Sequence, residues 1–263
     1  MTSRPKWWES GGGLYDQSYY QEPPGGVAIS PAFVKSQASY IIKTCGLRRG
    51  NRVLEIACGA GQVSTALAAR GLDVIGIDIN DYFLSRARRS ARKARVRARF
   101  MRSEMRQLPF DDAEFKTFVV CGSSLGIFRR EADNMMVFKE MLRVLKPGGR
   151  IFLEGWIPYT PAEIRKHTKK NASHWDQNLP RGGVVHCTTW HDKKRRSYIV
   201  LEYPEKTLKI DYKVYSDLEL RRIFHSFGIG VEHIDYIEYW NWRSCERTSK
   251  QAHRLVCVAQ KPR

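Results

Sequence analysis

Long apolar runs are missing from this chain of 263 residues. No window of about 18 apolar residues occurs, so we expect no membrane-spanning helix. The first residues, MTSRPKWWESGGG, lack the apolar core of a secretory signal, and none of the six cysteines forms a CxxC pair. We therefore expect a cytoplasmic protein with reduced thiols.

Acidic residues are scarce. The chain has 27 Asp and Glu against 45 Lys and Arg, which gives a formal net charge of +18. Much of the excess lies in one stretch, RARRSARKARVRAR, at residues 86–99. A nucleic-acid partner is one interpretation of this stretch, and a solvated helix face is the other. Charge alone is a weak indicator, so we favour the solvated face and keep the nucleic-acid partner as the alternative.

Strand and helix patterns alternate along residues 31–155. Repeated strand–helix units with short connections predict an α/β fold, in which helices cover both faces of a parallel sheet. Asn80 or Asp81 is a plausible helix N-cap. The predicted strands are 52–57, 73–78, 96–102, 115–121 and 150–154, and the predicted helices are 31–45, 62–70, 81–94 and 133–145, the last stopped by KPGG at 146–149.

The pattern changes after residue 180. Three β-rich runs separated by polar turns, at 184–190, 197–203 and 207–215, predict an antiparallel meander. A helical pattern at 217–227 and strands at 231–239 and 255–259 complete the chain.

The chain divides into an arm and one domain. Residues 1–30 are rich in glycine, proline and aromatic side chains, which predicts an N-terminal arm or lid. Residues 31–263 form a single domain, in which 180–215 are an antiparallel β insertion. The sequence does not specify an oligomeric state.

Two glycines follow the first strand, in the stretch VLEIACGAGQ at 53–62. A dinucleotide site needs the pattern GxGxxG, and here the sixth position is Ser64. No Gly-Lys-Ser/Thr follows, so a P-loop is excluded. The motif therefore favours a ligand without phosphate, held where the missing Cβ atoms let it approach the backbone.

Acidic side chains lie at the ends of the predicted parallel strands. Glu55 precedes the glycines, and Asp78 closes the second strand, where a carboxylate can accept both hydroxyls of a ribose. After the third strand, Glu104 is placed to accept an adenine amino hydrogen, and the N–H of Met105 to meet a ring nitrogen. Ile79 and Met105 are placed to sandwich the ring. Open α/β sheets bind ligands at this edge.

Four stretches in order, VLEIACGAGQVS, VIGIDIN, SEMRQLPFDDAEF and MLRVLKPGGRIFLEG, resemble the successive motifs of class I S-adenosylmethionine-dependent methyltransferases. The resemblance covers about residues 50–155, and HRLVCVAQKPR resembles the last strand of the family. It implies a Rossmann-like seven-stranded sheet whose last strand is antiparallel, and S-adenosylmethionine as cofactor. The meander followed by YSDLELRRIFHSFGIGVEHI resembles bacterial members that act on small molecules, in which an antiparallel segment covers the acceptor site.

The resemblance also implies roles for particular residues. The glycine loop and Glu55 would border the methionine part of the cofactor, Asp78 the ribose, and Glu104 with Met105 the adenine. Glu104 stands where the family usually has Asp. The expected cofactor-binding residues are Tyr15, Glu55, Ala57, Cys58, Gly59, Gly61, Gln62, Asp78, Ile79, Glu104, Met105 and Cys121.

The expected function is methyl transfer by in-line displacement to a small-molecule acceptor at O, N or C. Positioning dominates this chemistry, so no catalytic triad is needed. Weak candidates for a catalytic role are Tyr20 in the arm and His174 after the fifth strand. No metal site is expected, because His186, Cys187 and His191 have no further ligand at metal-like spacing.

Two alternatives remain. The basic tracts suggest an RNA (tRNA) methyltransferase, although CGSSLGIF after the fourth strand is not the NPPY-type motif of base-amino methylation. The second alternative is a catalytically silent scaffold that keeps the cofactor-binding fold.

Overall fold

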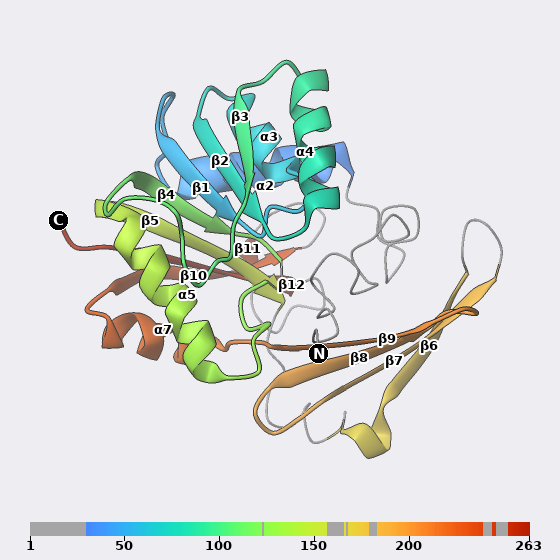
Figure 1. Cartoon of the computed structure of the whole chain (residues 1–263). Helices are drawn as coiled ribbons and strands as arrows, with labels where there is room; N and C mark the ends of the chain where they lie inside the picture. Colours follow the sequence, from blue (N-terminus) through green and yellow to red (C-terminus); the bar gives the residue numbers. More distant parts are fainter. Residues whose placement is uncertain are drawn as a thin grey trace, which may run out of the picture.

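A computed structural model describes residues 30–122, 124–156, 166, 168–178, 183–238, 244–245 and 252–263 (Figure 1). The predicted arm therefore lies outside the described residues except for Ser30, and so do Tyr15 and Tyr20. No helix in the described ranges is long and apolar enough to cross a membrane.

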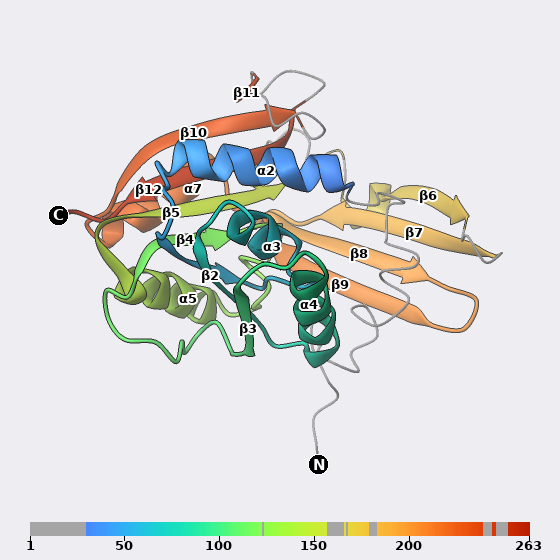
Figure 2. The same ribbon diagram turned by 90° about the horizontal axis from the view of Figure 1, so that it is seen from above.

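The central sheet has eight strands in the order β11-β10-β12-β5-β4-β1-β2-β3 (Figures 1 and 2). The strands β1 to β5 are parallel to one another, β12 is antiparallel to β5, and β10 is antiparallel to β12. The predicted sheet with an antiparallel last strand is confirmed, and the two-residue β11 adds an eighth strand at one edge. The strands are β1 (Arg52–Ile56), β2 (Asp73–Asp78), β3 (Ala98–Arg102), β4 (Phe115–Val120), β5 (Leu145–Trp156), β10 (Gly230–Glu238), β11 (Ser244–Cys245) and β12 (Ala252–Gln260).

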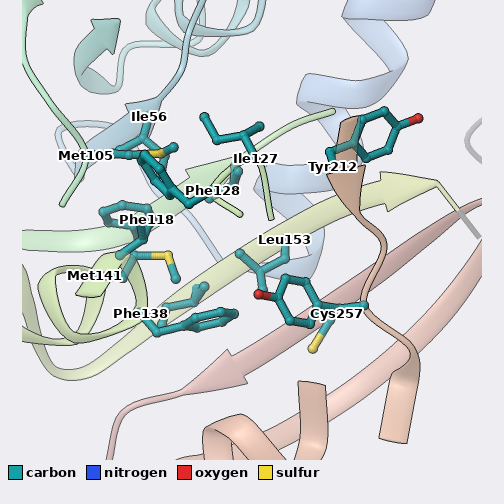
Figure 3. Close-up of a cluster of buried hydrophobic side chains, with 14 of the residues drawn as sticks. Ile56, Met105, Phe118, Ile127, Phe128, Phe138, Met141, Leu153, Tyr212 and Cys257 are labelled. Carbon is teal, nitrogen blue, oxygen red and sulfur yellow. The ribbon is translucent and has the colours of Figure 1, made fainter. Parts of the chain in front are cut away.

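Helices cover both faces of this sheet. The alternation along β1 sets the two faces, because Val53 packs in the cluster with α2 and α3, whereas Leu54 packs in the cluster with α5 and α7. Figure 3 shows part of the second cluster, with Phe118 of β4 beside Phe138 and Met141 of α5. The helices are α2 (Pro31–Thr44), α3 (Gln62–Ala68), α4 (Asp81–Lys93), α5 (Glu131–Val144) and α7 (Asp217–Ser226).

Side chains cap the N-termini of two helices and so fix where these helices begin. The side chain of Asn80 accepts a hydrogen bond from the Phe83 N–H at 3.3 Å, which confirms Asn80 as the N-cap of α4. Ser216 and Glu219 form a reciprocal capping box at the start of α7.

The sequence predicted that the KPGG segment at 146–149 separates helix 133–145 from a strand that begins at residue 150. In the structure this segment is part of the strand. Strand β5 already begins at Leu145, opposite Phe115, and the register then shifts so that Thr117 pairs with Arg150. Gly148, at φ +67°, bends the segment and donates its N–H to the Lys261 carbonyl at 3.0 Å. Proline and glycine here form an irregularity within a strand.

A second, antiparallel sheet has the order β6-β7-β8-β9, where the sequence predicted three strands. The second sheet therefore begins at residue 173. The missed strand, SHWDQN, is polar and pairs only with β7 among the described strands, so apolar alternation could not reveal it. The strands are β6 (Ser173–Asn178), β7 (Val184–His191), β8 (Arg196–Glu202) and β9 (Thr207–Lys213), preceded by the short 3₁₀ helix η1 (Lys169–Asn171).

The second sheet is attached to the loop after β4. The N–H of Lys213 donates to the Gly126 carbonyl at 2.9 Å, and Arg196 donates to the Ile127 carbonyl at 3.2 Å. Gly126 has φ +90°, and a Cβ on it would lie 2.3 Å from the Lys213 carbonyl oxygen, so this approach needs glycine. In Figure 2, β5 points toward the second sheet, which therefore extends beyond the carboxyl end of the parallel strands.

Candidate functional site

The loop between β1 and α3 carries three left-handed residues, at φ +49° for Ala57, +53° for Gly59 and +69° for Gly61. A Cβ on Gly59 would meet nothing closer than Phe83 at 4.0 Å, so the surface above Gly59 is open. A Cβ on Gly61 would lie 2.5 Å from the Phe100 ring. Gly59 thus fits the expected ligand approach, whereas packing inside the protein already requires glycine at Gly61. Ala57 holds a conformation that disfavours any residue with a side chain.

Asp78 joins this loop to the end of β2. One carboxylate oxygen accepts the Gly59 N–H at 2.9 Å, and the other accepts the Asn80 N–H at 2.9 Å. Burial raises the pKa of Asp78 above its usual value, although hydrogen bonds from the backbone of Asn80, Gly59 and Ile79 oppose the rise. An ionised carboxylate has about four lone-pair sites, so Asp78 keeps capacity for a further donor.

Glu55 lies inside the protein, at 3% exposure, and its carboxylate accepts a hydrogen bond from the Ser64 hydroxyl of α3. Burial raises the pKa of Glu55 to about 7, and the Ser64 bond partly offsets this rise. The described contacts of Glu55 therefore support the first turn of α3. Its expected place beside the methionine part of a cofactor stays a prediction.

Glu104, after β3, is held by Arg106. The Arg106 N–H donates to one carboxylate oxygen at 3.1 Å, and its Nε donates to the other at 2.5 Å. The same guanidinium lies 4.3 Å above the Phe128 ring and 3.6 Å from Asp133. Arg106 was not predicted as a site residue. Its position two residues after Glu104 could have indicated that it contacts this carboxylate.

The remaining predicted cofactor residues lie around the same edge. Met105 is buried beside Ile56 and Phe128 (Figure 3), and Ile79 is half-buried after β2. Gln62 is exposed in the first turn of α3.

The two cysteines of the predicted site differ in what they can offer. The Cys58 sulfur packs tightly against Gly76, where an added Cβ would lie 2.9 Å away. The backbone of Cys58 is also engaged, because its N–H donates to the Ile77 carbonyl and its carbonyl accepts the Gly61 N–H, both at 2.9 Å. Cys121 follows β4, and its thiol pKa is raised, first by burial and then by Glu154. Neither thiol is therefore a ready nucleophile.

A cavity of about 50 Å³ lies next to this edge, between the ends of β4 and β5 and the connection from β9 to α7. Its lining is mostly apolar, and Figure 3 shows Leu153 and Tyr212 among the lining side chains. The lining residues are Gly122, Leu125, Leu153, Glu154, Gly155, Tyr212, Lys213, Val214, Tyr215, Leu220 and Leu255.

Glu154 is the acid in this cavity. Its Oε2 accepts the Gly122 N–H at 2.8 Å, and its Oε1 lies 2.9 Å from Arg254 Nη1. Both side chains of the ion pair are buried, at 3% and 10% exposure. Because Gly122 and Arg254 engage this carboxylate, it fixes the loop after β4 to β5 and β12.

The histidine candidate lies elsewhere. His174 is exposed on β6, and its Nδ1 is 3.0 Å from the Thr188 hydroxyl. β6 is the outer strand of the second sheet, whereas β9, at the other side of that sheet, contacts the loop after β4. The structure therefore does not bring His174 to the cavity.

The comparisons with known proteins agree with this geometry. Residues 53–149 match the family model described as a methyltransferase domain. YqeM of Bacillus subtilis (strain 168) is 33% identical over 113 residues, which are 43% of this chain and 45% of that protein. The ubiquinone/menaquinone biosynthesis C-methyltransferase UbiE of Idiomarina loihiensis is 38% identical over 120 residues, 43% of this chain and 46% of that protein.

The whole fold has counterparts among solved structures. An S-adenosylmethionine-dependent methyltransferase from Clostridium acetobutylicum superposes with a TM-score of 0.71 at 15% identity, over 93% of this chain and 96% of that one. The fold is that of the Rossmann-like methyltransferases. Residues 53–149 are thus similar in sequence to a methyltransferase domain, and the fold as a whole is similar to that of an S-adenosylmethionine-dependent methyltransferase. The chain matches somewhat less than half of the length of either curated relative.

Proposed function

We propose that the protein transfers a methyl group from S-adenosylmethionine to a small-molecule acceptor. The observation that carries the proposal is the row of groups at the carboxyl ends of β1 to β5. Gly59, Asp78 and Glu104 lie on one side of this row, and the cavity beside Gly122 and Glu154 lies on the other.

The cofactor fits the residues present on the first side. Asp78 would accept the ribose hydroxyls, because its carboxylate is fixed by backbone hydrogen bonds and keeps lone-pair capacity. Glu104 would accept the adenine amino group, with Met105 and Ile79 on the faces of the ring. The open backbone at Gly59 gives the ligand room to approach.

The acceptor would enter the cavity from the side of the second sheet. Apolar side chains from β5, β9, α7 and β12 line it, so it favours an apolar group over a polar base. The name of the relative UbiE, a C-methyltransferase of ubiquinone and menaquinone biosynthesis, also supports a small-molecule acceptor.

S-adenosylmethionine supplies an electrophilic methyl group when it is bound. The residues of this chain then act by position, because in-line transfer needs the acceptor atom close to the methyl group and shielded from water. Gly122 and Glu154 would fix the wall between the two binding regions. The Gly122 N–H and the charge of the buried Arg254 guanidinium hold the Glu154 carboxylate, so we assign it no proton transfer.

The test uses S-adenosylmethionine labelled in its methyl group. The protein is incubated with the label and a cell extract that is then separated into small-molecule, RNA and protein fractions. We expect label in the small-molecule fraction, and none with the Asp78→Ala variant. Label confined to RNA would support the tRNA methyltransferase alternative, and label in no fraction despite cofactor binding would support a silent scaffold.

A further inference from the structure

One stretch of strongly basic surface takes no part in the proposed site. It consists of exposed residues in the second half of α4 and the turn before β3, and we refer to it as the basic face. Its members are Arg88, Arg89, Arg92, Lys93, Arg95 and Arg97.

The charges of the basic face are not neutralised within the described part of the protein. Apart from Arg88, which donates to the Phe100 carbonyl at 3.0 Å, its side chains form no ion pair or hydrogen bond with the described residues. Nearby basic residues behave differently, because Arg99 pairs with Asp73 and Arg102 with Asp81. The five remaining cations thus stand together without an acid among the described residues.

This arrangement costs helix stability. Arg88 and Arg92 are four residues apart, and so are Arg89 and Lys93, and like charges at this spacing repel each other on a helix. The helix dipole favours the two cations in the last turn but not those before them. Stability of α4 therefore does not explain the basic face, and a partner with negative charge would.

The composition of the basic face indicates the chemistry of that partner. All apolar side chains of α4 that could enter a lipid layer, namely Phe83, Leu84, Ala87 and Ala91, are buried against the sheet. Five of the six cations are arginine, whose planar guanidinium binds phosphate oxygens through two parallel hydrogen bonds. We propose that the basic face binds the phosphodiester backbone of a nucleic acid.

The position of the basic face makes this binding separate from the acceptor cavity. α4 packs at the β3 edge of the central sheet (Figure 1), whereas the cavity lies between β5 and the second sheet. The nucleic acid would contact phosphate-binding side chains only, so the contact would be insensitive to base sequence. The inference goes beyond methyl transfer and does not depend on it.

The test is fluorescence anisotropy with labelled tRNA, single-stranded RNA and duplex DNA over a salt series. The variant Arg89→Gln/Arg92→Gln/Lys93→Gln removes three charges from the basic face. The control, Lys193→Gln/Lys194→Gln/Lys209→Gln, removes three exposed and unpaired charges from the second sheet. Each lost phosphate contact lowers the slope of log affinity against log salt by about 0.7–0.9. We expect the first variant to lose about 2–3 in slope and tenfold or more in affinity, and the control to lose less than about 1 in slope.

Three results would overturn the proposal. Equal losses in both variants would mean that only net charge matters. No binding by the wild type at low salt would mean that the face only protects the β3 edge from pairing with another chain. Stronger binding to anionic lipid vesicles than to every nucleic acid would mean that the partner is a membrane. If the helix variant fails to fold by circular dichroism, Arg95→Gln/Arg97→Gln, outside the helix, serves the same test with a loss of about 1.5 in slope.

Discussion

At the scale of single residues, Asp78 is the strongest link between structure and cofactor. Replacing it with alanine would remove the acceptor of the ribose hydroxyls and free the Gly59 N–H. Hydrogen bonds to a charged group contribute about 1.5–3 kcal/mol each. We therefore expect calorimetry to show more than a tenfold loss of affinity for the demethylated cofactor. Asp73→Ala, which removes an exposed carboxylate from the other end of β2, should leave affinity unchanged, and a smaller loss for Asp78→Ala would contradict the ribose role.

The two loop glycines should behave differently when substituted. Gly61→Val would push a side chain into Phe100 and Ala87, so the melting temperature should fall by several degrees together with ligand affinity. Gly59→Ala meets open space, and its left-handed backbone costs about 1–2 kcal/mol. Differential scanning calorimetry with and without ligand separates the two effects. Equal melting temperatures for both variants would argue against the packing role of Gly61.

Glu55 should make stability depend on pH. Its pKa is about 7 in the folded protein, above the usual value near 4.5, so the folded state binds the proton more tightly than the unfolded chain. The stabilisation is complete below about pH 4.5 and is lost as the pH rises to about 7, with a total change of up to about 3 kcal/mol. Urea unfolding at several pH values should show this decline in the wild type. The decline should be absent from Glu55→Gln, whose side chain can still accept the Ser64 hydrogen bond. If the free energy of unfolding of this variant falls with pH as steeply as that of the wild type, Glu55 is not the group responsible.

At the scale of elements, Arg196 attaches the second sheet to the rest of the domain. It is 12% exposed, pairs with Asp211 at 2.5 Å and donates to the carbonyls of Ile127 and Phe128. Removing one partner of a buried ion pair costs about 3–5 kcal/mol. For Arg196→Met we expect faster hydrogen exchange in β8, β9 and the loop after β4, with the central parallel strands unaffected. Lys194→Met, at an exposed turn position, is the control, and equal exchange in both variants would contradict this role.

The elements also show what sequence can and cannot predict. The parallel strands β1, β2 and β4 were predictable because each is mostly apolar and buried on both faces. The edge strand β3 has only Phe100 buried, and its place in the strand–helix alternation indicated it. The same logic placed Asp78 beside Gly59. Strand β6 was not predicted, because its residues are polar. The start of β5 was predicted too late, because the proline–glycine pair of KPGG lies within an irregular strand and does not precede it.

Contacts between distant parts of the chain were beyond sequence reasoning. Arg106 joins Glu104 to Phe128, and Arg196 meets the carbonyls of the loop after β4, about 70 residues earlier. No periodicity in the sequence encodes such pairs. The packing of Gly61 against Phe100 could not be predicted for the same reason, since Phe100 lies on another strand.

At the scale of the whole molecule, we assign different functions to the central sheet and the second sheet. In the proposed function, the strand ends of the central sheet would hold the cofactor. The second sheet and its connection to α7 line one side of the neighbouring cavity. The predicted lid at residues 1–30 stays a prediction. We therefore expect cofactor binding in residues 53–149, which match the methyltransferase domain, and acceptor choice mainly in the later residues that line the cavity, beside Gly122 and Leu125.

The most direct test of this account is a calorimetric titration of the wild-type protein with S-adenosylhomocysteine. The account predicts saturable binding of one molecule per chain. We also expect weaker binding of the analogue with inosine in place of adenosine, because Glu104 would accept a hydrogen bond from the adenine amino group that the analogue lacks. Absence of saturable heat for S-adenosylhomocysteine would contradict the account.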